Sequence, residues 1–461
     1  MSEGDTMKIL RIFCSSVIAL SLFFTSSFVY AAEPLKEVKS IVKEYYYPKA
    51  PSNALKSKTI KDLMKQLDAY SVYMTKDEYQ TFENTIKMKF IGIGVTILEN
   101  KKGLQITSIF KGGPAEKASL RAGDIITKVD GKSIAGESSE KTLSLLTGKE
   151  NTKVKLMIFR PATKKTFDKT LTRKVIHLPN VEKRKLAGKI GFIRLNSFSD
   201  QSGKEVQNAI KSMPGMKGWI FDLRSNGGGY VSTAQKVIGL FPKATYAFVY
   251  KARQGNYQIY SAIKQKVQWN APVAILTDAN TASASEMTVA AAKDLKLAKI
   301  YGQTTYGKGV MQDIIPLSDG SILKLTTAEF FGPNLYKINK RGIKPDITTA
   351  IGKEVEKGHN DYLLKRLKNY KKLSAIEKNT SSQAISLKAS KNLSWTAMKK
   401  SNVYLWQIGG VSRKITVKYS SGKKLVITPS KQLKAGTNYY LVVKPKSNNA
   451  KGVYSKVTVR K

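Results

Sequence analysis

The sequence predicts a multidomain α+β protein, and three observations lead to this fold class. The chain has 461 residues, which is enough for about three domains. Its 41% hydrophobic and 9% aromatic residues are typical of a globular protein with packed cores. The spacing of apolar residues also changes along the chain, from a helical period to short β runs, then to alternating strands and helices, and finally to strands alone.

The first 31 residues are typical of a secretory signal peptide. Lys8 and Arg11 precede the apolar run IFCSSVIALSLFFTSSFVYA, and Val29 and Ala31 supply the small residues of a cleavage site. We therefore expect residues 1–31 to be removed on export, with an uncleaved membrane anchor as the alternative. Cys14, the only cysteine, lies in this run, so the mature chain would carry no disulfide and no cysteine metal site.

The next two segments differ in pattern. Residues 32–87 place apolar side chains three and four positions apart, which predicts an N-terminal region of short helices. Residues 88–174 contain short β-rich runs, such as FIGIGVTIL and KVKLMIFR, separated by Gly-Gly-Pro and Asp-Gly turns. This change predicts a small, mostly β domain after the helices.

The second half of the chain begins with an α/β pattern. Strands and helices alternate through residues 175–351, which predicts a parallel or mixed α/β core. Residues 352–380 are charged and indicate a helical connector, and residues 381–461 contain strand-like runs at the spacing of an all-β sandwich. No Asp or Glu follows Glu377, so the last segment is purely cationic.

The formal net charge of +46 favours an anionic partner, although a solvated coat of lysines that keeps the protein soluble would give the same charge. An exported protein seldom meets nucleic acid, so we do not expect nucleic acid as a partner. Anionic cell-wall polymers, bound through the basic C-terminal segment, are the partner that the charge favours.

The stretch TASASE offers serine hydroxyls ahead of a small-residue helix, and a serine nucleophile needs a base. The two histidines, His177 in a basic β segment and His359 in the connector, do not follow α/β strands, where sites usually form. Lysine is the remaining base, because burial can lower its pKa towards neutrality. Lys308 lies between two glycines in YGKGVMQ, and Gln312 shares its face if this run is extended. An exposed glycine turn would give the same pattern.

Two features could stabilise an oxyanion. Strand WIFDLR runs into SNGGGY, whose glycines can present N–H groups to an anion, and no Gly-Lys-Ser/Thr follows to indicate a nucleotide site. Ser283 and Glu286 have capping-box spacing, and a helix that begins there would place N–H groups beside the serine hydroxyl. On its own, this spacing favours a plain helix cap.

The order DLRSNGGG, TASASE, TYGKGVMQ resembles the C-terminal processing peptidases, or tail-specific proteases. These are serine endopeptidases with a Ser-Lys dyad on a crotonase-like α/β core. The resemblance implies that Ser283 is the nucleophile, that Lys308 is the base and that Gln312 orients it, with Ser285 structural. It further implies oxyanion donors at the N–H groups of Gly228 and Ala284, and a supporting carboxylate, found in some members, at Asp294.

The resemblance extends upstream of the core. FIGIGV followed by GGPAEKASLRAGDIITKVDGKSI looks like a PDZ domain, which this family inserts before its protease core. The turn residues Ile91, Gly92, Ile93 and Gly94 can offer N–H groups to a C-terminal carboxylate, and the bound tail would extend the sheet. Two departures are Gly227, where many members have Pro, and Thr147, where an Arg is common, which leaves the coupling of the PDZ domain to the core open. Residues 381–461 are similar to Ig-like domains of exported Gram-positive proteins.

Together these patterns predict an exported serine endopeptidase, at the wall or membrane surface of a Gram-positive-like cell, that acts on proteins or peptides near their C-termini. No metal or cofactor is expected. The alternative is a wall-associated peptide-binding protein with a degenerate, inactive core, and a homodimer is left open. We also expect the peptidase to keep its activity when the chain ends near Lys378.

Overall fold

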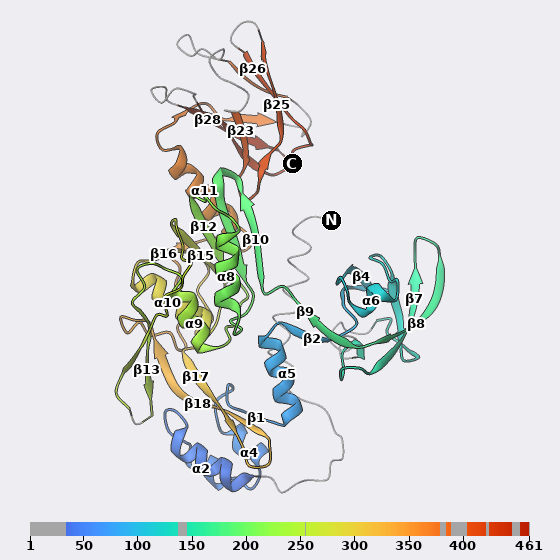
Figure 1. Cartoon of the computed structure of the whole chain (residues 1–461), viewed down its shortest axis with the longest axis vertical. Helices are drawn as coiled ribbons and strands as arrows, with labels where there is room; N and C mark the ends of the chain where they lie inside the picture. Colours follow the sequence, from blue (N-terminus) through green and yellow to red (C-terminus); the bar gives the residue numbers. More distant parts are fainter. Residues whose placement is uncertain are drawn as a thin grey trace.

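The computed structural model describes residues 34–136, 145–253, 255–378, 384–388, 403–420, 424–444 and 452–460. The expected signal peptide, residues 1–31, lies outside this part of the chain. Across the described ranges, no helix combines the length and apolarity that a membrane crossing requires. The α/β core lies at the centre, with the N-terminal helices at one end, the C-terminal strands at the other and a small β domain to the side (Figure 1).

The central sheet has six strands and is mostly parallel. In spatial order it comprises β10 (Val181–Leu186), β11 (Ile190–Leu195), β12 (Gly218–Asp222), β15 (Val273–Thr277), β16 (Ala298–Gly302) and β19 (Ile347–Thr348). Only the edge strand β10 runs antiparallel to its neighbour. Strands β11, β12 and β15 are buried along their whole length, as continuous apolar runs covered on both faces should be.

Helices cover both faces of this sheet. One face packs on α8 (Ser202–Lys211), α9 (Val231–Ile238) and α10 (Ala284–Asp294), and the other on α11 (Glu354–Leu367). A short 3₁₀ turn, η2 (Ala187–Lys189), joins β10 to β11. The helical faces and the alternation of elements match the α/β pattern of the sequence.

A second sheet connects the core to the N-terminal region. It comprises β1 (Val72–Met74), β18 (Ile322–Phe331), β13 (Tyr246–Ala252) and β14 (Gln258–Ser261), and β17 (Val310–Pro316) also pairs with β18. The helices α2 (Leu35–Tyr45), α3 (Ser52–Lys56) and α4 (Ile60–Lys65) share an apolar cluster with β18. The N-terminal region is not purely helical, because its strand β1 pairs with β18 in this second sheet.

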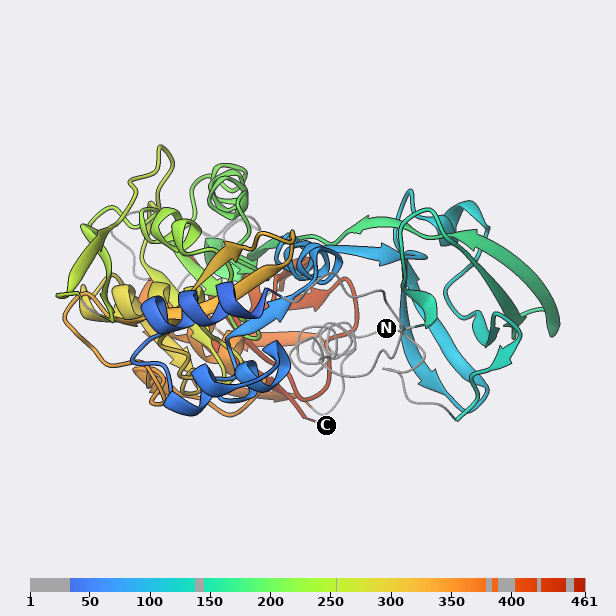
Figure 2. The ribbon, with the colours of Figure 1, turned by 90° about the horizontal axis from the view of Figure 1, so that it is seen from below.

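The small β domain stands apart from the core (Figure 2). Its sheet comprises β3 (Val95–Asn100), β4 (Gly103–Ile109), β5 (Ile125–Val129), β6 (Lys132–Ser133), β7 (Lys153–Arg160) and β8 (Lys165–Thr172), beside α6 (Pro114–Lys117). These elements enclose an apolar cluster of their own. Helix α5 (Lys76–Ile86) and the two-stranded ribbon of β2 (Lys89–Gly92) and β9 (Lys174–His177) lead to and from it.

The C-terminal strands form two sheets. One comprises β20 (Lys371–Lys372), β28 (Val453–Val459), β27 (Asn438–Val443), β23 (Val403–Gln407) and β24 (Ser412–Arg413), with β21 (Ile376–Lys378) also on β28; the other comprises β22 (Ile385–Lys388), β26 (Lys424–Pro429) and β25 (Ile415–Ser420). The connector over residues 352–380 was expected to be helical, but the helix ends at Leu367. Strands β20 and β21 pair in parallel with the last strand, so the C-terminal module begins earlier than residue 381.

Candidate active site

Three loops meet at one edge of the central sheet. They follow β12, β15 and β16, which are neighbours and run parallel. The carboxyl ends of these strands therefore lie side by side, where sites form in open α/β sheets. The loops are residues 223–229, 278–283 and 303–309, and they contain the glycine run, the serines and Lys308. Asp278 joins the first two loops, because its carboxylate accepts hydrogen bonds from the Ser225 N–H at 2.8 Å and the Ser225 hydroxyl at 2.9 Å.

Ser283 lies at the tight turn between β15 and α10. Its backbone angles are φ 57° and ψ −118°, in a region that non-glycine residues rarely adopt and that costs about 1–3 kcal/mol. The turn is fixed on both sides, since the Ser283 N–H donates to Glu286 at 3.0 Å and its carbonyl accepts from the Met287 N–H at 3.0 Å. Such strain is common at functional turns from strand to helix.

The Glu286 carboxylate connects the serine loop to the lysine loop. Besides the Ser283 N–H, it accepts hydrogen bonds from the Thr305 hydroxyl at 2.6 Å, the Gly307 N–H at 2.7 Å and the Lys308 N–H at 2.9 Å. The side chain is fully buried, which raises its pKa, while the four donors oppose this rise. The sequence identified Glu286 only as a capping residue, and nothing in its spacing predicts the contacts with residues 305–308.

The Lys308 amine lies 4.8 Å from the centre of the Tyr70 ring. Burial lowers its pKa from 10.5 to about 8, and repulsion from Lys324 adds to this, while Asp68 and Glu286 act in the opposite direction. About a tenth of the amine is therefore neutral at pH 7, and more at higher pH, which is the form that a general base requires. The sequence identified Lys308 from its flanking glycines, but it gave no indication of Tyr70 as a neighbour.

Gln312 lies on β17, where its backbone is opposite Thr326 of β18. Its amide nitrogen donates to the Thr326 hydroxyl at 3.2 Å and to the Val310 carbonyl at 3.3 Å. The amide N–H groups are thus occupied by these two acceptors, and the amide carbonyl is the group left to accept a hydrogen bond. The structure fixes Gln312 through Thr326.

The two predicted oxyanion donors both adjoin Ser283. A methyl group added at Gly228, where φ is 104°, would lie 2.8 Å from Cβ of Ser283 and 2.9 Å from the nitrogen of Ala284. The Ala284 N–H belongs to the first turn of α10, whose N–H groups have no partners within the helix. The Gly228 N–H, by contrast, donates to Oδ1 of the buried Asn226 at 2.9 Å, a contact that the sequence analysis missed.

Asp294 is not brought to this site. It is the last residue of α10, and the ten residues from Ala284 correspond to about 15 Å of helix. Its carboxylate accepts a hydrogen bond from the Asn334 N–H at 3.0 Å, and burial raises its pKa. Asp294 therefore supports the turn after β18, whereas the resemblance assigned it to the catalytic groups.

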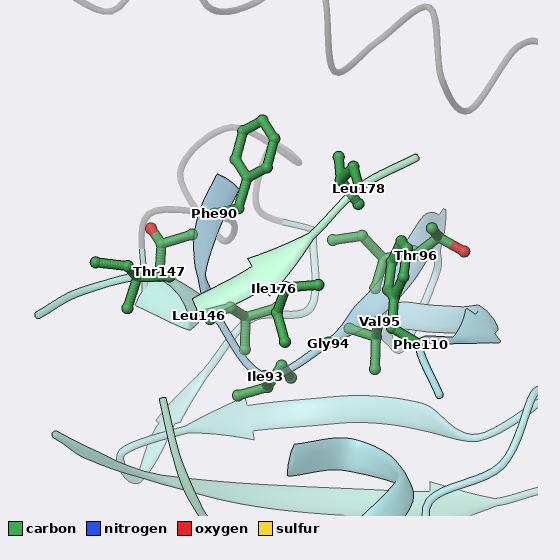
Figure 3. A pocket seen from close by; sticks show the side chains of 13 residues that line it. Phe90, Ile93, Gly94, Val95, Thr96, Phe110, Leu146, Thr147, Ile176 and Leu178 are labelled. Atoms are coloured by element: carbon green, nitrogen blue, oxygen red, sulfur yellow. The ribbon is translucent and has the colours of Figure 1, made fainter. Parts of the chain in front are cut away.

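Residues 91–94 line an apolar pocket of the small β domain (Figure 3). Ile91 and Gly92 pair with β9, and the carbonyls of Ile93 and Gly94 accept hydrogen bonds at 2.8 and 3.0 Å. The other walls of the pocket are mostly apolar side chains, among them Val95, Phe110, Leu146 and Ile176. This geometry suits an apolar side chain beside the turn.

Neither histidine contacts the three loops. His359 is fully buried between α11 and the C-terminal module, where Nδ1 accepts from the Gly409 N–H at 2.8 Å and Nε2 lies 2.9 Å from the Ala187 carbonyl. Burial lowers its pKa to about 4, so the ring is neutral. His177 lies on β9 of the ribbon. Within the described ranges, no group of three His, Cys, Asp or Glu side chains could hold a metal ion.

Comparisons with known proteins identify two domains. Residues 189–349 match the model of peptidase family S41, and residues 91–171 match that of the PDZ domain. These ranges contain the three loops and the apolar pocket, respectively. They confirm the resemblance that the motifs indicated.

The chain is also similar to individual proteins. It is 35% identical over 319 residues to a "Probable CtpA-like serine protease" of Staphylococcus aureus, which covers 68% of this chain and 64% of that protein. A protein of the same description from Staphylococcus haemolyticus is 36% identical over 327 residues, covering 68% and 65%. Among solved structures, a photosystem II D1 C-terminal processing protease is 27% identical, covering 68% of this chain and 92% of that chain, with a TM-score of 0.45.

Proposed function

We propose that this chain, in which residues 189–349 belong to peptidase family S41 and residues 91–171 to the PDZ domains, is a serine endopeptidase that cleaves proteins near their C-termini. The observation that carries the proposal is the position of Glu286, whose single carboxylate binds the backbone of both Ser283 and Lys308. A serine on a strained turn and a lysine of lowered pKa are thereby held in adjoining loops.

In this mechanism the neutral Lys308 amine takes the proton of the Ser283 hydroxyl, and the serine oxygen attacks the scissile carbonyl. The N–H of Ala284 and the positive end of α10 stabilise the oxyanion that forms. The lysine then donates its proton to the leaving amine, and water hydrolyses the acyl-enzyme with the same amine as base. The Gly228 N–H can act as the second donor once it leaves Asn226.

The PDZ domain would select substrates by their tails. We expect the turn of residues 91–94 to receive a terminal carboxylate and the apolar pocket beside it to accept a side chain. Substrates are accordingly proteins or peptides with a free C-terminus. Amidating that terminus should slow cleavage, and equal rates for the two forms would count against a tail-reading role.

Export and wall attachment complete the proposal. The basic, apolar N-terminal run supports export. The strand-rich C-terminal module resembles Ig-like domains and carries no carboxylate after Glu377, which supports attraction to anionic wall polymers. Binding of the whole protein to wall material should therefore fall as salt rises, since screening shortens the range of such attraction to about 8 Å at physiological ionic strength.

A pair of serine variants tests the activity. Ser283→Ala should abolish cleavage of an unfolded protein substrate. Ser285→Ala is the matched control, because Ser285 is buried and its hydroxyl donates only to the Asn226 carbonyl, at 2.9 Å, a bond worth about 1 kcal/mol of stability. Cleavage by Ser283→Ala would refute Ser283 as the nucleophile, whereas no cleavage by the wild type would leave the alternative of a peptide-binding protein with an inactive core.

A further inference from the structure

A short segment of the N-terminal region, residues 68–71, reaches the candidate active site. It lies between α4 and β1. Asp68 organises its backbone, because Oδ1 accepts hydrogen bonds from the Tyr70 N–H at 2.8 Å and the Ser71 N–H at 3.1 Å. The Asp68 N–H in turn donates to the Tyr46 hydroxyl at 3.0 Å. The position of Tyr70 is thus set by a compact turn.

This turn is hydrogen-bonded to β18, the strand whose Thr326 also binds the Gln312 amide. The Thr326 hydroxyl donates to Oδ1 of Asp68 at 3.0 Å, and the Thr326 N–H donates to the Ser71 hydroxyl at 3.1 Å. Thr326 is also the residue that receives the Gln312 amide. The segment and Gln312 therefore share one support, Thr326 on β18.

Tyr70 closes over the lysine from this support. Its ring faces the Lys308 amine at 4.8 Å, a distance at which an aromatic face attracts a cation. Its hydroxyl lies near that of Tyr306, which belongs to the same loop as Lys308, and burial together with this neighbour raises the Tyr70 pKa to about 12. The backbone of Tyr70 is thus fixed by the N-terminal turn, and its ring contacts the lysine loop through the Lys308 amine.

We propose that Tyr70 is a positioning residue for the candidate base, holding the Lys308 amine under its ring and keeping water from it. This inference rests on the proposed function, and it makes the N-terminal region part of the active site. The resemblance had assigned no site residue to that region.

The groups around the Lys308 amine determine whether removing the Tyr70 ring raises or lowers the pKa of Lys308. Lys324 on β18 repels the protonated amine, whereas Asp68 in the N-terminal turn and Glu286 on α10 attract it; the Tyr70 ring faces it, and Tyr306 is near the Tyr70 hydroxyl. Burial is the largest cause of the lowered pKa of Lys308. Removing the ring admits water, so it should raise this pKa even though it also removes the attraction of the aromatic face.

The test is the pH dependence of kcat/KM for cleavage of a fluorogenic unfolded peptide by the purified enzyme. The wild type and Tyr70→Phe should share an acid limb near pH 8, since both keep the ring. In Tyr70→Ala and Tyr70→Gln the limb should move up by about one pH unit, which means about a tenfold loss at pH 7 and less than about a twofold loss at pH 10. Tyr45→Ala, which changes a tyrosine that is 51% exposed in the same region, is the control and should match the wild type.

Thermal melts identify variants that do not fold, and Tyr70→Gln then replaces Tyr70→Ala because it keeps a side chain of some length. An equal loss of activity at every pH would overturn the proposal, because Tyr70 would then only brace the fold. An unchanged acid limb in both Tyr70→Ala and Tyr70→Gln would overturn it as well. The proposed peptidase function is tested separately by Ser283→Ala, so a failure of one idea is distinguishable from a failure of the other.

Discussion

Replacing Lys308 with methionine should abolish peptidase activity and, at the same time, stabilise the protein. The amine is a base because it is poorly solvated, and the same burial makes its charged form costly in the folded state. Methionine has a similar length and no charge. At Lys308 the burial that catalysis requires would therefore lower the stability of the folded protein.

The magnitude follows from the pKa. A fall from 10.5 to about 8 corresponds to about 3 kcal/mol, since each pKa unit is worth about 1.4 kcal/mol. The folded pKa lies below the unfolded value, so the destabilisation is complete below pH 8 and disappears as the pH rises through 10.5. The free energy of unfolding of Lys308→Met should therefore exceed that of the wild type by about 3 kcal/mol at pH 7 and by only about 1 kcal/mol at pH 10.

Urea denaturation of both proteins at pH 7 and pH 10 measures this difference. Lys149→Met serves as the control, because Lys149 is 83% exposed in its side chain and its ion pair with Asp77 should contribute little. A Lys308→Met protein that is less stable than the wild type at pH 7, or equally stabilised at both pH values, would refute the reasoning that the lysine is buried and neutralisable.

Three further variants test other parts of the structure. Glu286→Ala should lose activity and about 2–4 kcal/mol of stability in urea denaturation, because four donors lose their acceptor. Asp294→Asn should keep activity within about threefold in a peptide cleavage assay, since the residue lies about 15 Å along the helix from Ala284, which follows Ser283. The free energy of unfolding of the wild type should fall by up to about 3 kcal/mol between pH 6.5 and pH 4, because burial depresses the pKa of His359 in the folded state and keeps its ring neutral. Thermal melts across this pH range should show that His359→Gln removes the dependence.

The meeting of the three motifs could be predicted because each follows a strand of an alternating α/β pattern. The sequence places WIFD, VAILT and AKIYG directly before the three loops, and neighbouring parallel strands end at one edge. The roles of Ser283 and Lys308 depended further on the family resemblance, since a helix cap and a glycine turn would have given the same local patterns.

The other features of the site and fold depend on contacts between segments that are distant in the sequence, and local sequence patterns do not predict such contacts. Tyr70 precedes Lys308 by more than two hundred residues, and only the pairing of β1 with β18 brings it to the amine. The sequence analysis did not predict β20 and β21, because both strands are short and residues 371–378 are rich in charge. Their partner β28 also lies about eighty residues later in the chain. The contact of Asp294 with Asn334 could not be predicted, because a motif fixes its place in the helix but not what its far end contacts.

The C-terminal module is built into the core, and this changes what its removal would do. Leu363 and Leu367 of α11 pack on Trp406 and Ile408 of the module, and His359 donates to and accepts from groups on both sides of this joint. A chain that ends near Lys378 would expose these side chains to water, so truncation there is expected to loosen α11.

Loosening α11 would also destabilise the loop of residues 223–229, which contains the glycine run. Glu354, at the first turn of this helix, forms a buried ion pair at 2.6 Å with Arg224, which lies at the start of the loop and also binds Asp222. Losing one partner of a buried pair leaves an uncompensated charge and costs about 3–5 kcal/mol. The expectation that the peptidase would work without this module is therefore replaced by its opposite: the truncated chain should lose activity because residues 223–229 lose their support, while Ser283 and Lys308 are still present.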